Sequence, residues 1–191
     1  GGLRRRGVHV SHPAGGLPRD GHGEWALRDP KRERRGAGRP HAQESFRRLL
    51  PEASPIFTPY GATEAMPTLL VDSGEVLAET RKFTEKGYGI CVGRPVEGVA
   101  VRIIKITDDP ILEWSDSLVV GVGEIGEIAV KGAVASSGYF QRPRDDALSK
   151  IRDGNSFWHR MGDVGWQDET GRIWFCGRKG HRVQTETGTL F

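Results

Sequence analysis

The residues best suited to chemistry begin at Tyr60-Gly61-Ala62-Thr63-Glu64, which follows a short apolar run. On a strand-to-loop turn, Gly61 would let the backbone approach a ligand closely. Thr63 then offers a hydroxyl, and Glu64 offers a hard carboxylate oxygen of the kind that Mg²⁺ prefers. In the alternative interpretation, the threonine caps a following helix and the glutamate only favours its N-terminus. Both interpretations stay open on this motif alone.

A second pair of polar groups is expected where two strands of a hairpin open. The turn residues Asp168–Gly171 separate the apolar runs Val164–Trp166 and Arg172–Cys176, which is a hairpin pattern. Asp163 and Arg178 therefore lie at the open ends of the two strands and are expected to be close in space. The carboxylate could accept two hydrogen bonds from a ribose diol beside the guanidinium. The alternative is a structural ion pair that closes the hairpin.

Other polar and aromatic residues are expected to have plain structural roles. His159 and His181 are read as partly exposed loop histidines without a chemical function, although both could act as general bases. Lys179 and Arg182 are read as a solvated basic strand edge. Four tryptophans are expected to pack in the core and the hairpin: Trp114, Trp158, Trp166 and Trp174.

Patterns of apolar residues predict the elements that must position these groups. We expect helices over residues 45–50 and 145–151, and strands over residues 56–58, 99–106 and 126–132. The first helix should bury Phe46, Leu49 and Leu50 on one face and end at Pro51.

The basic charge of the chain is concentrated near its start. Residues 1–44 hold ten Lys or Arg against five Asp or Glu, which is +5, whereas the whole chain carries +3. Residues 1–43 show no helical or alternating period and are expected to be a basic segment of low order. We weigh three origins: an arm that contacts nucleic acid, a solvated tail, or out-of-frame translation of a GC-rich gene. The third is favoured because ordered patterning starts abruptly at Glu44.

The remaining composition points to a cytoplasmic protein. Cys91 and Cys176 lie far apart without a CxxC pattern, so a disulfide framework or a zinc site is not expected. No apolar run has the length of a membrane span. The chain begins with Gly1 rather than Met, and we read it as a piece of something longer.

Five motifs in one order resemble the acyl-adenylate-forming superfamily, which contains acyl-CoA synthetases, luciferases and peptide-synthetase adenylation domains. Three of them surround Tyr60, Asp163 and Arg178. The other two are Gly93-Arg94-Pro95 and the stretch Gly126-Glu127-Ile128 with Val130 and Gly132, which Gly138-Tyr139 follows. The resemblance implies a mixed α/β fold. Residues 44–178 would be part of the large AMP-binding domain, with a distorted β-barrel subdomain from about Gly93 to Arg178. Residues 179–191 would hold the hinge and the start of a C-terminal domain.

The resemblance also implies roles for single residues. Tyr60 would pack on adenine beside Gly61, and Thr63 would bind the α-phosphate. Glu64 would be the Mg²⁺ ligand, so that Thr63 and Glu64 act in catalysis. Asp163 would hold the ribose and Arg178 the ribose and phosphate. The hinge position is Gly180, where the family often has Asp or Lys, so a side-chain role is absent there.

In such enzymes, a small-molecule carboxylic acid attacks ATP and leaves pyrophosphate, and a second nucleophile displaces AMP from the acyl-adenylate. The stretch Trp174–Val183 and the residues Thr107–Ile111 resemble bacterial olefin β-lactone synthetases and fatty-acid ligases. The acceptor would then be a β-hydroxyl of the same substrate, or coenzyme A in the alternative of a long-chain acyl-CoA ligase.

Two departures from the family lead us to expect an inactive polypeptide. The 191 residues contain no Thr/Ser/Gly-rich phosphate loop, and they end at Phe191, just past the hinge. We therefore expect no appreciable adenylation by this chain alone. Two other classes stay open: a non-catalytic β-rich module that binds a nucleotide or a partner, and, less favoured, a basic nucleic-acid-binding protein.

Overall fold

The computed structural model describes residues 8–9, 26–27, 40–51, 54–185 and 188–190, so most of the basic segment 1–43 lies outside the described residues. The strands, in chain order, are β1 (Val8–His9), β2 (Ala26–Leu27), β3 (Phe57–Ala62), β4 (Ala65–Asp72), β5 (Ile90–Pro95), β6 (Ala100–Ile104), β7 (Gly126–Lys131), β8 (Lys150–Asp153), β9 (Ser156–Gln167), β10 (Ile173–Arg178), β11 (Val183–Thr185) and β12 (Gly188–Leu190). The α-helical segments are α1 (Pro40–Arg47), α2 (Ser73–Glu75), α3 (Arg81–Glu85) and α4 (Pro143–Ser149).

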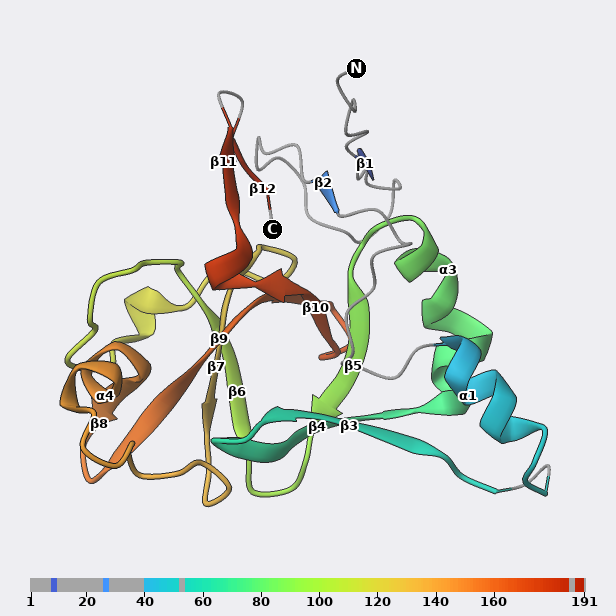
Figure 1. Cartoon of the computed structure of the whole chain (residues 1–191), viewed down its shortest axis with the longest axis horizontal. Helices are drawn as coiled ribbons and strands as arrows, with labels where there is room; N and C mark the ends of the chain where they lie inside the picture. Colours follow the sequence, from blue (N-terminus) through green and yellow to red (C-terminus); the bar gives the residue numbers. More distant parts are fainter. Residues whose placement is uncertain (1–7, 10–25, 28–39, 52–53, 186–187, 191) are drawn as a thin grey trace.

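Eight strands form one antiparallel sheet with a few helices against it, which confirms the expected mixed α/β class. The order is β3-β4-β5-β10-β9-β7-β6, and β8 pairs with β9. In Figure 1 the β3–β4 hairpin runs across one end of β5, β6 and β7. The subdomain expected as a distorted barrel corresponds to β5 through β10. Among the described residues, no helix is long and apolar enough to cross a membrane.

Strand β7, which lies between β9 and β6, is buried on both faces of the sheet. Ile128 and Val130 point into a core cluster to which β3, β4, β5, β6, β9 and β10 also contribute. Ala129, between them, joins a second cluster with Ile151 and Trp158 on the other face. All three β7 residues are fully buried, as the β-branched run predicts.

The predicted elements are present with shifted ends. Helix α1 ends at Arg47, and the expected core residues Leu49 and Leu50 follow it, 81% and 42% exposed. The prediction that Leu49 and Leu50 lie on the buried face of a helix was wrong. A proline disfavours the helical conformation of the residue before it, here Leu50 before Pro51, so the helix ends earlier. Helix α4 begins two residues earlier than expected.

A helical segment that the sequence analysis missed follows β4. Asp72 caps its start, since Oδ1 accepts hydrogen bonds from the amides of Gly74 (2.8 Å) and Glu75 (3.3 Å). The segment continues from α2 through a π-helical turn (Val76–Thr80) into α3. Aspartate is a common N-cap residue, so the aspartate before Ser-Gly-Glu could have predicted the start of this helix.

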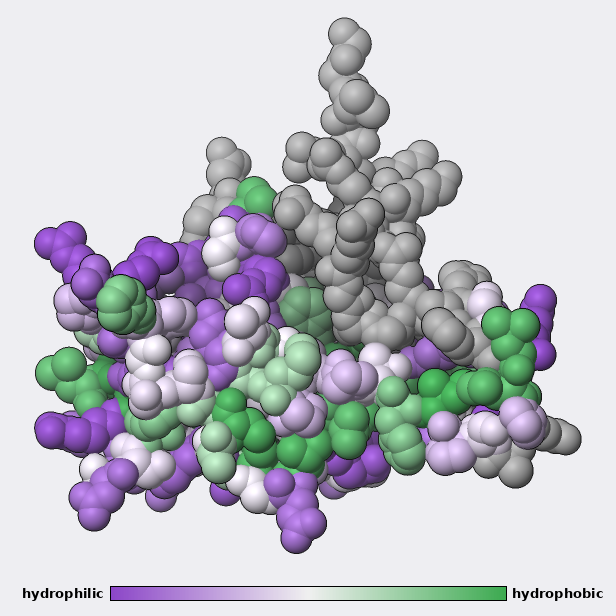
Figure 2. Space-filling view, turned by 60° about the horizontal axis from the view of Figure 1, so that its bottom comes forward, coloured by the Kyte–Doolittle hydropathy of each residue, from purple (hydrophilic) through white to green (hydrophobic). Residues whose placement is uncertain are grey.

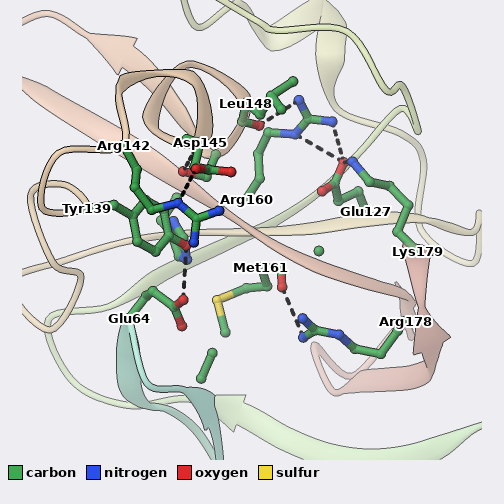
Figure 3. A pocket seen from close by; sticks show the side chains of 14 residues that line it. Glu64, Glu127, Tyr139, Arg142, Asp145, Leu148, Arg160, Met161, Arg178 and Lys179 are labelled. Atoms are coloured by element: carbon green, nitrogen blue, oxygen red, sulfur yellow. Dashed lines mark hydrogen bonds and ion pairs between the residues drawn. The ribbon is translucent and has the colours of Figure 1, made fainter. Parts of the chain in front are cut away.

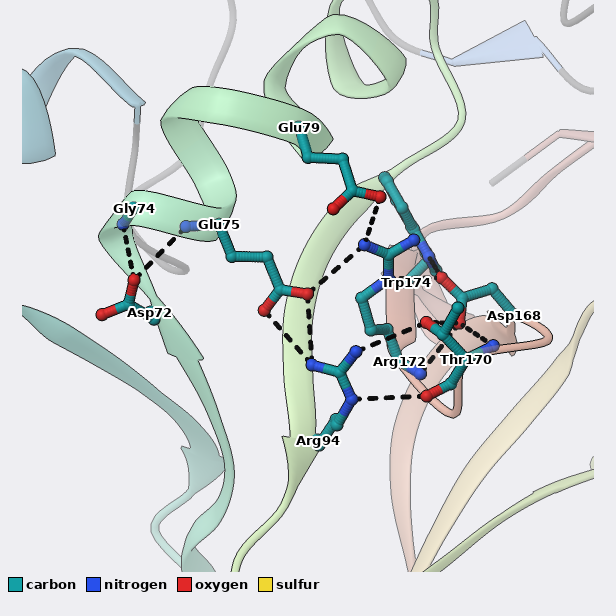
Figure 4. A network of polar contacts seen from close by, with 9 residues as sticks. All are labelled: Asp72, Gly74, Glu75, Glu79, Arg94, Asp168, Thr170, Arg172 and Trp174. Carbon is teal, nitrogen blue, oxygen red and sulfur yellow. Dashed lines mark hydrogen bonds and ion pairs between the residues drawn. The ribbon is translucent and has the colours of Figure 1, made fainter.

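A polar network ties this segment to the turn between β9 and β10 (Figure 4). The Arg172 side chain, 9% exposed, donates from Nε to Asp168 at 2.6 Å and from Nη1 to Glu79 at 2.9 Å. Arg94 on β5 donates to Glu75 at 3.1 Å. The stacked rings of Trp166 and Trp174, 5.3 Å apart, lie beneath the network, and Trp114 and Trp158 stack at 4.3 Å. The expected packing role of the four tryptophans is confirmed.

Candidate functional site

Three of the predicted site residues meet at the open end of the β9–β10 hairpin. Asp163 and Arg178 are close in space, as the turn pattern predicts, and a register shift between Phe175 and Gly177 makes them direct partners. Arg178 Nη1 donates to Asp163 Oδ1 at 2.8 Å, and the Tyr60 hydroxyl donates to Asp163 Oδ2 at 2.5 Å. The Asp163 side chain is 6% exposed, whereas half of the Arg178 side chain is exposed. The site is therefore a buried acceptor held between a phenol and a solvent-facing guanidinium.

Burial dominates the electrostatics of this cluster. It raises the pKa of the Asp163 carboxyl, and the hydrogen bond from Tyr60 and the charge of Arg178 only partly offset that effect. The Tyr60 pKa is also raised, first by burial and then by the neighbouring Asp163 charge. Tyr60 therefore keeps its proton and acts as a donor, which makes the arrangement a fixed donor–acceptor set rather than a proton-transfer pair.

The ring of Tyr60 belongs to the core. It is 8% exposed, and its centroid lies 6.2 Å from that of Phe175 on β10 at an interplanar angle of 47°. The hydroxyl, rather than a free ring face, points to the other site residues. Packing of this ring on an adenine stays a prediction.

Gly61, Thr63 and Glu64 lie at the tip of the β3–β4 hairpin. Thr63 and Glu64 form the turn, and β4 begins at Ala65, so the alternative in which Thr63 caps a helix is wrong. A Cβ atom on Gly61 would lie 2.4 Å from the Ala65 carbonyl oxygen. Gly61 is thus required by the irregular register of this hairpin. Thr63 is exposed and Glu64 is half-buried.

A pocket of about 350 Å³ lies beside this hairpin tip (Figure 3). Of the predicted residues, Glu64 and Arg178 line it. Much of its wall comes from β9 and from the segment around α4, which supply charged and hydrogen-bonding groups. The lining includes Tyr139, Arg142, Asp145, His159, Arg160 and Lys179.

Glu64 presents an ionised carboxylate to this pocket. Burial acts to raise its pKa, but a hydrogen bond from its own backbone, another from Tyr139 and the charge of Arg178 bring the pKa below its usual value. The described residues hold no cluster of three or more His, Cys, Asp or Glu side chains that could bind a metal alone. One carboxylate does fit Mg²⁺ that arrives with phosphates, because proteins bind such ions through one or two carboxylates.

A buried ion cluster in the pocket wall was not foreseen. Glu127 on β7 accepts from Arg160 Nη2 at 2.7 Å and from Lys179 Nζ at 3.0 Å, and both carboxylate and guanidinium are almost fully buried. Lys179, expected at a solvated edge, is 17% exposed, so that prediction was wrong. A glutamate inside the apolar β7 run was the available signal, because a buried charge needs a cationic partner.

His159 also differs from its expected role. It lies on β9 rather than in a loop and is 2% exposed. Its Nδ1 atom has no hydrogen-bond partner among the residues that the structure describes. Burial, helped by the nearby Lys150 charge and opposed by Glu64, lowers the His159 pKa to about 4. The imidazole is therefore neutral at pH 7.

Gly180 lies in a 3₁₀ turn (Lys179–His181) directly after β10. It is exposed, and a Cβ there would meet no atom within 4 Å. An added side chain would therefore point into open space here. Its role as a hinge stays a prediction.

The chain is similar in sequence to known enzymes. No protein-family model matches the chain. An olefin β-lactone synthetase from Stenotrophomonas maltophilia is 48% identical over 157 residues, which are 80% of this chain and 28% of that protein. A 2-succinylbenzoate–CoA ligase from Geobacillus kaustophilus is 30% identical over 65% of this chain and 21% of its own length. This chain thus spans about a quarter of the length of these curated relatives.

A solved structure has the same fold. The O-succinylbenzoate coenzyme A synthetase from Bacillus subtilis, in complex with ATP and magnesium ion, matches with a TM-score of 0.59 and 22% identity. The match covers 82% of this chain and 28% of that one.

Proposed function

Since this chain belongs to the acyl-adenylate-forming superfamily, we propose that it contributes nucleotide-binding residues to an enzyme that activates a carboxylic acid with ATP. The observation that carries the proposal is the meeting of Tyr60, Asp163 and Arg178 at one hairpin mouth. In this proposal, residues 44–178 belong to the AMP-binding domain, and residues 179–191 begin the next domain, with Gly180 at the hinge.

The proposed chemistry assigns a task to each group. Asp163 and Arg178 hold the ribose, with Arg178 also near the phosphates, and Tyr60 fixes the Asp163 carboxylate and supports the adenine. Gly61 keeps the hairpin tip close to the nucleotide, where Thr63 binds the α-phosphate and Glu64 holds Mg²⁺. Mg²⁺ would neutralise charge that develops on the phosphates when the acid displaces pyrophosphate.

The second half-reaction concerns the acceptor. The 48% identity to an olefin β-lactone synthetase favours a β-hydroxy fatty acid whose own hydroxyl displaces AMP and closes the lactone. The runner-up is transfer to coenzyme A, as the name of the 2-succinylbenzoate relative suggests. We place the protein in the cytoplasm, where ATP and either acceptor are present.

Nucleotide titration of the isotopically labelled chain tests the proposal. AMP should shift the amide signals of Gly61, Asp163 and Arg178, and Asp163→Asn should weaken AMP binding about 10-fold or more, because a hydrogen bond to a charged group contributes about 1.5–3 kcal/mol. Asp116→Asn, an exposed change distant from the site residues in sequence, is the control. Equal AMP affinity of the Asp163→Asn variant would refute the proposal.

ATP–pyrophosphate exchange with fatty and β-hydroxy fatty acids separates binding from catalysis. We expect AMP binding without appreciable exchange by this chain alone. Clear exchange would show that the 191 residues suffice for adenylation. Absence of any nucleotide binding would favour a non-catalytic interaction module.

A further inference from the structure

The loop between β7 and α4 contacts Glu64 at two points. The Ser136 amide donates to the Glu64 carbonyl oxygen at 2.7 Å, and the Tyr139 hydroxyl donates to Glu64 Oε1 at 3.0 Å (Figure 3). An isolated β-bridge between Ala65 and Ala135 continues the same contact. Backbone and side chain of Glu64 are therefore both held by a segment more than 70 positions away in sequence.

Tyr139 is itself held in place. Its amide donates to Asp146 Oδ1 on α4 at 2.8 Å, and the Lys150 ammonium lies 5.9 Å from the centroid of its ring. A Cβ on the preceding Gly138 would come within 3.1 Å of the Asp146 carboxylate, so the glycine permits this close approach. The phenol is half-buried and presents its hydroxyl to Glu64 from a fixed support.

The Tyr139 hydroxyl bonds one of the two oxygens of the Glu64 carboxylate. Oε1 accepts from Tyr139, and Oε2 is the other oxygen of the same group. We propose that Tyr139 is a positioning residue that fixes the Glu64 carboxylate so that Oε2 serves a divalent cation bound to nucleotide phosphates. The inference rests on the proposed function, since Glu64 is the cation ligand there. A side chain that hydrogen-bonds to a metal ligand orients that ligand and strengthens metal binding.

A double-mutant cycle tests whether Tyr139 acts through Glu64. The dissociation constant of Mn²⁺·ATP is measured, by line broadening of amide signals, for the wild-type chain, Tyr139→Phe, Glu64→Gln and the double variant. Tyr139→Phe should weaken binding about 10-fold, within the usual range for loss of such a partner. Glu64→Gln should weaken it at least as much, and the double variant should match Glu64→Gln, because the phenol has no carboxylate left to orient.

A second readout needs no bound cation. Relaxation of the Glu64 side-chain methylene carbons should report greater mobility in Tyr139→Phe than in the wild-type chain. Tyr88→Phe removes a hydroxyl from a buried tyrosine in another core cluster and serves as the control for both measurements. Urea unfolding of each variant verifies that the fold is retained.

The outcomes separate this inference from the proposed function. If Tyr139→Phe binds Mn²⁺·ATP as tightly as the wild-type chain while Glu64→Gln binds it more weakly, the positioning role of Tyr139 is overturned. Glu64 then remains the cation ligand. A further loss in the double variant also overturns it, since Tyr139 would then act on the nucleotide or on the fold. Unchanged binding by Glu64→Gln, or no binding by the wild-type chain, removes the cation role of Glu64 and this inference with it.

Discussion

At the scale of single residues, the buried charges of the pocket wall determine how much a substitution lowers the free energy of unfolding. Arg160 is almost completely enclosed, and besides Glu127 it donates to the carbonyls of Asp109 (2.9 Å) and Leu148 (3.0 Å). Its guanidinium therefore ties the loop after β6 and the end of α4 to β9. The negative charge of Glu127 compensates the cost of burying that cation.

Glu127→Gln should lower the free energy of unfolding by about 3–5 kcal/mol, because the substitution leaves the Arg160 charge buried without a counter-ion. Glu113→Gln is the matched control. Its carboxylate pairs with Arg152 in an exposed ion pair, and such pairs contribute about 0–1 kcal/mol. Urea unfolding measures both variants. Equal losses would contradict the assigned difference between the buried and the exposed pair.

His159 makes stability depend on pH. In the unfolded chain, His159 has a pKa near 6.5, whereas in the folded chain its pKa is about 4. Between these pH values the unfolded state therefore binds more protons than the folded state. The chain should lose up to about 3 kcal/mol as the pH falls through this window. The facing charges are Lys150 on β8 and Glu64 at the hairpin tip.

His159→Gln removes this proton uptake from the unfolded chain. The stability difference between the wild-type chain and the variant should therefore shrink as the pH falls from 7 to about 4. Unfolding in urea at several pH values measures it. A difference that stays constant over this range would show that His159 does not titrate differently in the two states.

At the scale of elements, hairpin geometry explains what could be read from the sequence. The Asp168–Gly171 turn pairs β9 with β10 and brings Asp163 near Arg178, and a register shift between Phe175 and Gly177 sets the two residues directly opposite each other. That part of the site was predictable because hairpin pairing is local. Periodicity likewise located β6 and β7.

The other contacts of the site could not be predicted from local sequence patterns, because they join residues that are distant in the sequence. Tyr60 reaches Asp163 across 103 positions, and Tyr139 reaches Glu64 across 75. No local pattern in β9 indicates that His159 is buried, since a histidine fits an edge or a core. Lys179 was misread for the same reason: its partner Glu127 lies 52 positions earlier.

The β3–β4 hairpin gives a prediction at this scale. Gly61→Ala should destabilise the chain by roughly 1–3 kcal/mol, because the new methyl group would overlap the Ala65 carbonyl and force the two strands apart. Gly180→Ala has open space around it and should change stability by no more than about 0.5 kcal/mol. Thermal unfolding compares the two variants. Similar melting temperatures would contradict the close contact at Gly61.

At the scale of the whole molecule, the outer surface of the β3–β4 hairpin is apolar and exposed. Phe57, Met66 and Leu70, all on the β3–β4 hairpin, are 56%, 56% and 38% exposed. Figure 2 shows hydrophobic residues gathered in a band along the face that lies lowest in Figure 1. β3 is also an end strand of the sheet, and an exposed apolar edge favours association.

We therefore expect the isolated chain to self-associate through this face and to bind a hydrophobic fluorescent dye. Phe57→Lys should reduce both, because a lysine on an edge strand opposes strand-to-strand pairing. Val122→Lys adds the same charge at an exposed residue outside the strands, where it should have little effect. Sedimentation and dye fluorescence at several protein concentrations measure the response. An equal reduction by both lysine variants would attribute association to net charge, and the apolar hairpin face would then have no special part in it.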